Sequence, residues 1–182
     1  MKIKALILAG GQARRFGGGD KGLALLDGRT LIDHVLDALA GCEVALSANG
    51  DPGRFDAFGL PVLEDGEFTG MGPLAGLAAG LQWARDADVL ISVPCDTPIL
   101  PPDLIPRLLP GPAYARSDGR DHYLVASWRP DCLPHLLAVL RAGDSLKVEG
   151  LTRAVAATPI EFTGGNRLFA NINRREDLDS GG

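Results

Sequence analysis

A glycine-rich stretch near the N-terminus concentrates the residue types that bind phosphate. Three cations, Arg14, Arg15 and Lys21, fall within eight residues and are interleaved with glycines at 10–11 and 17–19. Glycine lets backbone N–H groups approach an anion closely, and guanidinium and ammonium groups neutralise phosphate charge. We therefore predict that this stretch is a triphosphate-binding loop.

Two well-known phosphate-binding loops do not match this stretch. A P-loop requires a lysine followed by Ser or Thr, whereas Lys21 follows Asp20 and precedes Gly22. A dinucleotide fingerprint requires G-x-G-x-x-G opening into a helix, and the glycines at 10–11 and 17–19 do not keep that spacing. A glycine-rich surface loop without a ligand is the alternative. The apolar run before the glycines and the paired arginines within them make that alternative the weaker one.

Polar residues and a glycine also follow the ends of the predicted strands. Gly10, Asn49, Asp65 and Asp96 each lie one to three residues beyond such an end. In an open parallel sheet these positions gather in the crevice beyond the carboxyl ends of the strands, where ligands bind. Triphosphate chemistry needs a hard oxygen ligand for Mg²⁺, and we assign that role to Asp96. A turn-forming or helix-capping role is the alternative, and for Asn49 and Asp65 the two interpretations carry equal weight.

The elements that position these residues follow an α/β order. Short apolar runs predict strands at 5–9, 43–47, 60–63 and 88–93, and amphipathic or small-residue patterns predict helices at 30–39, 73–83 and 103–109. We expect Thr30 to cap the first helix and His34 to face solvent on it. This alternation with short connections predicts a mostly parallel sheet with right-handed crossovers.

The second half of the chain has a less regular pattern. Strands are predicted at 113–116 and 124–128 around a polar turn at 117–121, and this pair is expected to be antiparallel. A helix at 132–140 stops at Gly143, and Ser145 is the expected cap of another helix. Late strands are predicted at 158–162 and 168–172, with a final helical turn at 174–178.

Composition indicates one soluble globular domain. The chain has 182 residues, is 46% apolar, and contains no apolar run long enough to span a bilayer. A net charge of −5 argues against a general nucleic-acid surface, so we expect neither a nucleic-acid nor a membrane partner. The 3 cysteines are widely spaced, with neither a disulfide framework nor a zinc motif, and we expect a cytoplasmic location.

Three motifs in order resemble the molybdenum cofactor guanylyltransferase family. The first is L-A-G-G-x-x-x-R-F-G-x-x-D-K, from Leu8 to Lys21; the second is G-P-L-A-G at 72–76; the third is C-D-T-P at 95–98 with P-P-D-L at 101–104. The similarity runs over nearly the whole chain and is densest from 8 to 104. It implies a Rossmann-like three-layer nucleotidyltransferase fold, with helices on both faces of a mostly parallel central sheet and some antiparallel strand in the second half. It further implies one domain, 1–182, with a nucleotide-binding half (1–104) and a second-substrate half (105–182).

The resemblance also implies roles for individual residues. GTP would be held by Leu8, Ala9, Gly10, Gly11, Lys21, Asn49, Asp65, Gly72, Pro73, Leu74 and Asp96. Arg15, Lys21 and Asp96 would be catalytic, and Asp96 would ligate Mg²⁺, with Mn²⁺ as a substitute. Asn171 and Asn173, in an N-x-N segment, would lie on the pterin side. The chain departs from the family pattern at 120–124, where Tyr123-Leu124 replaces Pro and a small or hydroxyl residue. That segment is expected to line the second-substrate pocket.

The implied reaction transfers GMP from MgGTP to the terminal phosphate of molybdopterin and releases pyrophosphate. We expect a monomer that makes transient contact with other cofactor-biosynthesis or acceptor proteins. Two alternatives stay open: a nucleotidyltransferase of the same fold that uses CTP or a sugar phosphate, and a GTP-binding module without turnover.

Overall fold

The structure is a computed structural model that describes residues 1–10, 20–143, 145–165 and 167–172. Its centre is a seven-stranded sheet in the order β5-β4-β1-β6-β8-β7-β9. The strands are β1 (Ile3–Leu8), β4 (Glu43–Ser47), β5 (Val62–Leu63), β6 (Val89–Pro94), β7 (Ala113–Ser117), β8 (Arg120–Trp128) and β9 (Thr158–Glu161). β5, β4, β1 and β6 are mutually parallel, whereas β8 is antiparallel to both β6 and β7. The expected mostly parallel sheet with an antiparallel part is confirmed.

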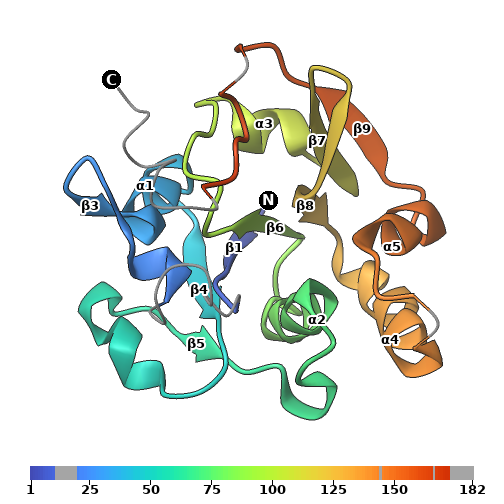
Figure 1. The fold of residues 1–182 in the computed structure, drawn as a ribbon. Helices are drawn as coiled ribbons and strands as arrows, with labels where there is room; N and C mark the ends of the chain where they lie inside the picture. Colours follow the sequence, from blue (N-terminus) through green and yellow to red (C-terminus); the bar gives the residue numbers. More distant parts are fainter. Residues whose placement is uncertain (11–19, 144, 166, 173–182) are drawn as a thin grey trace.

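Helices cover both faces of this sheet. The strands form a diagonal in Figure 1, with α1 (Leu31–Ala38) and α3 (Leu104–Leu108) on one side. The other side carries α2 (Pro73–Trp83), α4 (Leu133–Ala142) and α5 (Val148–Ala154). Two hydrophobic cores follow from this arrangement, because alternate residues of each strand point to opposite faces: Ala5 and Ile7 pack toward α1, and Leu6 and Leu8 pack toward α2. The three-layer architecture is confirmed.

The sheet changes from parallel to antiparallel at a buried polar contact. Trp128, which is fully buried at the end of β8, donates from Nε1 to Ser92 Oγ of β6 at 2.8 Å. Ser92 Oγ in turn donates to the backbone oxygen of Leu124 at 2.7 Å. The indole and the hydroxyl are therefore both satisfied, as buried polar groups must be, and they fix β8 against β6.

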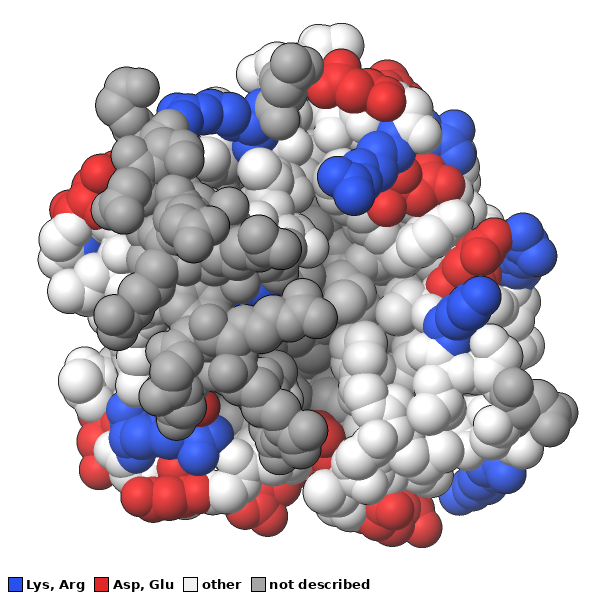
Figure 2. Space-filling view, viewed as in Figure 1, with Lys and Arg blue, Asp and Glu red and all other residues white. Residues whose placement is uncertain are grey.

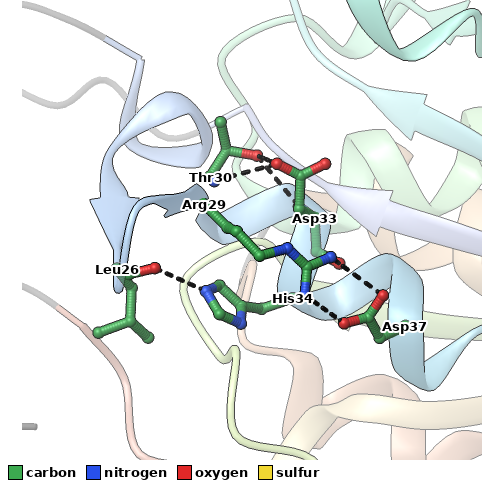
Figure 3. Close-up of polar contacts among 6 residues, drawn as sticks. All are labelled: Leu26, Arg29, Thr30, Asp33, His34 and Asp37. Carbon is green, nitrogen blue, oxygen red and sulfur yellow. Dashed lines mark hydrogen bonds and ion pairs between the residues drawn. The ribbon is translucent and has the colours of Figure 1, made fainter.

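A short hairpin carries the first helix. β2 (Leu25–Leu26) and β3 (Arg29–Thr30) are joined by Asp27 and Gly28, both at positive φ, which is the turn geometry that suits a two-residue hairpin. Thr30 then caps α1 through a capping box with Asp33, as expected. His34 is half-buried and contacts the backbone oxygen of Leu26 from Nε2 at 2.8 Å, as Figure 3 shows, so the expectation that it faces solvent is wrong. The imidazole ties the hairpin to the helix.

Two expectations for the later part of the chain are also wrong. Residues 168–172 form no strand, because Phe169 has a φ of 60° and interrupts the extended backbone. This segment instead crosses the strand ends, where Phe169 N donates to Ile99 O at 3.0 Å and Ile172 N donates to Asp96 O at 2.8 Å. The cap of α5 is Lys147 and not Ser145, because the helix begins only at Val148. The helical turn expected at 174–178 lies outside the described residues.

Helix α2 packs unusually close to the sheet because glycines face it. A Cβ at Gly76 would overlap Ser47 Oγ and stand 3.2 Å from Leu8 Cδ2, and a Cβ at Gly80 would overlap Leu6 Cδ2. The predicted bounds of this helix, 73–83, are confirmed. Pro73 at its first position and the small residues on its sheet-facing side are what made it recognisable.

We predict that Gly76→Ala lowers the free energy of unfolding by about 1–3 kcal/mol, because the added methyl overpacks the contact with β1 and β4. Gly150→Ala in α5 is the matched control, since a Cβ there meets nothing within 4 Å and alanine is favoured over glycine in a helix by about 1 kcal/mol. Urea unfolding should therefore move in opposite directions for the two variants. A Gly76→Ala protein as stable as the wild type would show that α2 does not touch the sheet this closely.

Candidate functional site

The carboxyl ends of the four parallel strands stop at one level. Strand register places Leu8, Ser47, Leu63 and Pro94 in a single row across β1, β4, β5 and β6. The ladder continues for one more residue, with Ala9 N donating to Ser47 O, Ala48 N to Leu63 O and Cys95 N to Leu8 O. Gly10, Asn49, Asp65 and Asp96 each lie two residues beyond this row. The expectation that they gather at one edge of the sheet is confirmed.

Lys21 and Asp96 form an ion pair at this edge. Lys21 Nζ lies 2.6 Å from Asp96 Oδ2, and the two side chains are only 14% and 19% exposed. Lys21 opens the short helix η1 (Lys21–Leu23), whose Gly22 lies flat on the core: a Cβ there would stand 2.8 Å from Ile32 Cδ1 and 3.5 Å from Cys95 Cβ. The backbone under Lys21 is thus fixed against α1 and β6. Gly11, Arg14 and Arg15 lie outside the described residues.

Asn49 and Asp65 bond to each other in both directions. Asn49 Nδ2 donates to Asp65 Oδ2 at 2.6 Å, and Asp65 N donates to Asn49 Oδ1 at 3.0 Å. Both residues are only partly buried. The pair therefore holds an amide and a carboxylate in fixed orientations beside the row of strand ends. These are groups that can pair with the polar edge of a base or with ribose hydroxyls.

The N-terminus of α2 lies at the level of these polar residues. Gly76 touches the row at Leu8 and Ser47, and Gly72 is four residues earlier, so it projects about 6 Å beyond the row at 1.5 Å per residue. Two residues of strand span a similar distance, roughly 6.6 Å. Gly72 has φ 72° and ψ −158°, a conformation open essentially only to glycine. Leu74 is fully buried in the core, so of this residue only the backbone can face a ligand.

A cavity of about 920 Å³ adjoins the row on the side of the antiparallel strands. Its walls come from the start of β8, from 146–149 before and within α5, and from 168–171. Thr97 connects it to the ion pair, because Thr97 Oγ1 lies 3.3 Å from Asp96 Oδ1 and donates to Asn171 Oδ1 at 3.1 Å. The segment 120–124 lines this cavity, and its expected role in binding the second substrate stays a prediction. Asn171 stands between the cavity and the Lys21–Asp96 pair. Asn173 lies outside the described residues.

One wall of this cavity is an ordered polar and aromatic network. Arg116 Nε donates to Asp121 Oδ1 at 2.5 Å, and Tyr123 OH donates to Asp121 Oδ2 at 3.0 Å. The Arg116 guanidinium holds the pKa of Asp121 below its usual value, whereas burial and this carboxylate raise the pKa of Tyr123 to about 12. Tyr123 therefore stays a neutral hydrogen-bond donor, with its ring 4.9 Å from that of Tyr114. Sequence reasoning found Tyr123 only as a departure from a pattern.

His122 is held within the same wall. Its Nε2 lies 3.0 Å from Ser117 Oγ, and its ring lies 4.9 Å from the ring of Phe169. Burial lowers the pKa of His122, and the nearby Arg120 guanidinium lowers it further. The imidazole is consequently neutral at pH 7.

The charges around this face are of both signs. In Figure 2 the described Lys, Arg, Asp and Glu side chains lie mainly toward the periphery, and described uncharged residues border the right-hand side of the hollow near the centre. Within the described ranges no group of three or more His, Cys, Asp or Glu is placed to hold a metal ion. Cys95, beside Asp96, is buried, and burial raises the pKa of its thiol to about 12. No helix in the described part of the chain is long and apolar enough to cross a bilayer.

Comparison of the sequence with known proteins points to one family. Residues 5–158 match the model of the MobA-like NTP transferase domain. A molybdenum cofactor guanylyltransferase from Acidiphilium cryptum is 45% identical over 182 residues, covering 98% of this chain and 93% of that protein. One from Rhodobacter capsulatus is 48% identical over 184 residues, covering 98% and 94%. The chain belongs to the molybdenum cofactor guanylyltransferase family. The resemblance carried by the three motifs is confirmed, and with it the assignment as a nucleotidyltransferase.

Solved structures share the fold of this guanylyltransferase family member. Molybdopterin-guanine dinucleotide biosynthesis protein A from Archaeoglobus fulgidus superposes with a TM-score of 0.76 at 21% identity, covering 99% of this chain and 96% of that one. A 2-C-methyl-D-erythritol 4-phosphate cytidylyltransferase from Thermus thermophilus gives 0.68 at 16% identity, covering 99% and 96%. At these identities the likeness shows the nucleotidyltransferase fold alone.

The lowered pKa of His122 predicts a pH-dependent stability for this guanylyltransferase family member. Unfolded histidine titrates near pH 6.5, so below about that pH the unfolded chain takes up a proton that the folded chain resists, and the free energy of unfolding falls. The His122→Gln protein should lose less stability between pH 7 and pH 5 in urea unfolding. Asp37, Asp86 and Asp121, whose pKa values are lowered, act only at lower pH. Parallel declines for the two proteins would contradict the burial of the imidazole.

Proposed function

We propose that this chain transfers GMP from MgGTP to the terminal phosphate of molybdopterin, releasing pyrophosphate and forming the guanine dinucleotide cofactor. The observation that carries the proposal is identity of 45–48% with named guanylyltransferases over 98% of the chain. The three motifs that resemble the family also converge on the row of strand ends described above.

The nucleotide half of the reaction uses the edge of the parallel strands. GTP binds to three sets of groups. These are backbone groups of Leu8, Ala9, Gly10 and Gly11, the Asn49–Asp65 pair, and the N-terminus of α2 at Gly72, Pro73 and Leu74. Lys21 and Arg15 face the β- and γ-phosphates. Support comes from the described residues alone: Gly10, Asn49, Asp65 and Asp96 lie at one level, and the start of α2 reaches the same level. Backbone N–H groups at a helix start and the Lys21 ammonium are both suited to phosphate oxygens.

Asp96 suits a magnesium ion of the kind that a nucleotide brings with it. Mg²⁺ is usually held by one or two carboxylates together with substrate phosphates, and not by a full protein cage. The part-exposed Asp96 carboxylate, without a three-residue cluster among the described residues, fits that pattern. Asp96 would hold Mg²⁺, or Mn²⁺ in its place, and the ion would supply charge neutralisation at the phosphate oxygens. Lys21 Nζ places a positive charge against the same carboxylate.

The cavity beside β8 takes the second substrate. Its 920 Å³ is within the range of small-molecule sites, and the part-exposed rings of Tyr123 and His122 are flat surfaces suited to a pterin. Asn171 lies where this cavity meets Asp96, and Asn173 is assigned to the same side. This gives the chain its two functional halves, 1–104 for GTP and 105–182 for molybdopterin, within one domain.

The chemistry requires charge and position more than proton transfer. An oxygen of the terminal molybdopterin phosphate attacks the α-phosphorus of GTP, and the bond from that phosphorus to the β-bridging oxygen breaks, so pyrophosphate leaves with the electron pair. The nucleophile is already an anion, so no general base is needed. Lys21, Arg15 and Asp96 therefore act by orienting the phosphates and by stabilising charge on the leaving group.

The enzyme works as a cytoplasmic monomer that meets other cofactor-biosynthesis or acceptor proteins only transiently.

Base choice separates this proposal from a CTP-dependent enzyme of the same fold. Calorimetry in the presence of Mg²⁺ should show GTP binding at least tenfold more tightly than CTP or ATP. Pyrophosphate release in the presence of molybdopterin should follow the same order. Stronger binding of CTP would move the chain to cytidylyl transfer, and GTP binding without pyrophosphate release would favour a non-catalytic module.

Substitution of Asp96 separates a metal ligand from a turn former. Asp96→Asn keeps the shape and the turn-forming capacity but removes the formal charge. We expect loss of at least a hundredfold in pyrophosphate release, with partial recovery at high Mg²⁺ or with Mn²⁺, and a nearly unchanged melting temperature. Asp103→Asn, at the exposed start of α3, is the control and should keep full activity. Full activity of Asp96→Asn at low Mg²⁺ would remove Asp96 from the site.

A further inference from the structure

Arg54 connects the two sides of the nucleotide edge. It lies in the short helix η2 (Pro52–Phe58), which follows the strand-end residue Asn49. Arg54 Nη2 donates to the backbone oxygen of Asn49 at 2.7 Å, and Arg54 Nε lies 2.8 Å from Asp20 Oδ2. Asp20 immediately precedes Lys21. One guanidinium therefore joins the residue beside Lys21 to the residue that pairs with Asp65.

The surroundings of Arg54 are built around the guanidinium. The buried Nε pairs with Asp20 as an ion pair and has no hydrogen-bond acceptor among the described residues. The side chains of Arg54 and Asp20 are 27% and 25% exposed, so water screens this pair only partly. The guanidinium carbon lies 4.9 Å from the ring centre of Phe55, which is buried in the core. Gly50, at a φ of 90°, leaves room for it, because a Cβ there would stand 3.1 Å from Nη1.

We propose that Arg54 is a positioning residue for GTP, acting through Asp20 and Asn49 without touching the substrate. The inference rests on the proposed function, because it assigns Lys21 to the phosphates and the Asn49–Asp65 pair to the nucleoside. These two groups lie on separate segments, 20–23 and 49–65. The planar guanidinium contacts Asp20 and Asn49 from separate nitrogen atoms and so fixes the distance between the two segments. A lysine ammonium, which is a single point charge, would do this less well. Neither Asp20 nor Asn49 reaches the other in the described contacts, so Arg54 supplies the link.

A purely structural role makes a different prediction. If Arg54 served only to hold η2 on the core, its loss would lower stability and leave the affinity for GTP unchanged. Arg54→Met tests this, since methionine retains the apolar stem over Phe55 and removes the fork. The matched control is Arg29→Met. Arg29, on β3, also joins a carboxylate, that of Asp37 at 2.6 and 3.1 Å, to a backbone oxygen, that of Asp33. Both partners lie on α1 (Figure 3) and away from the strand-end residues Asn49, Asp65 and Asp96.

The experiment measures the melting temperature, kcat and both KM values for each protein. In Arg54→Met the KM for GTP should rise about tenfold to a hundredfold, the range set by losing a hydrogen bond to a charged group. The kcat at saturating GTP and the KM for molybdopterin should stay within about threefold of the wild type. Arg29→Met should change none of the three. An unchanged KM for GTP in Arg54→Met, or an equal rise in Arg29→Met, would overturn the inference.

Asp20→Asn tests the same link from its other end and leaves η2 intact, so it decides the question if Arg54→Met does not fold. Removing a negative charge near a triphosphate should by itself tighten GTP binding, whereas breaking the Arg54 link should weaken it. We expect a rise in the KM for GTP, and a double variant no worse than Arg54→Met alone. An equal or lower KM in Asp20→Asn would overturn the inference. Failure of the wild type to bind GTP would refute the proposed function itself, a result distinct from equal binding by wild type and variants.

Discussion

The register of four parallel strands is the constraint on which the candidate site depends. Backbone hydrogen bonds hold Leu8, Ser47, Leu63 and Pro94 in one row, so whatever follows each strand by two residues must emerge at the same height. A single-residue slip of β4 would move Asn49 by more than 3 Å and turn its side chain to the opposite face. Such a slip would be costly, because alternate side chains of each strand are buried in opposite cores. Moving the strand by one residue would exchange the side chains that the two cores receive. The hydrophobic packing on both faces of the sheet therefore fixes the positions of the polar residues that follow the strands.

Within that frame the two polar pairs have different characters. Asn49 and Asp65 satisfy each other and need no ligand to hold their orientation. Lys21 and Asp96 instead place opposite charges in contact at a position where the proposed chemistry needs both. Because both side chains have little exposure, water screens this pair less than it screens a surface ion pair. In the proposed function the first pair would contact the nucleoside of GTP, and the second would face its charged phosphates.

Much of the parallel half could be predicted because its signals are local. Apolar runs that end in glycine or polar residues marked the strands before Gly10, Asn49 and Asp96, and Pro73 marked the start of α2. The cavity beside β8 was less accessible to prediction, since its walls come from segments as distant as Thr97, Tyr123, Lys147 and Phe169. The positive φ of Phe169 has no sequence signal in a non-glycine residue, so the strand expected at 168–172 was wrong. Arg54 was missed because an arginine in a turn has no pattern, and its role follows only from its partners. The ligand-binding and catalytic roles assigned to the site residues all remain predictions, and Gly11, Arg15 and Asn173 lie outside the described residues.

The glycine face of α2 has a consequence for how distant substitutions act on this protein. Helix α2 rests on the sheet at two glycines: Gly76 contacts it at the level of Leu8, and Gly80 at the level of Leu6. An added methyl group at one of these glycines would tilt the helix, and methyl groups at both would move it away from the sheet. Either movement carries Gly72 with it, about 6 Å beyond the first contact and 12 Å beyond the second at 1.5 Å per residue. Because the helix moves as a rigid unit, a change in the packing of buried apolar atoms displaces the amide groups at its N-terminus. Variants that meet no ligand can thus shift affinity for one.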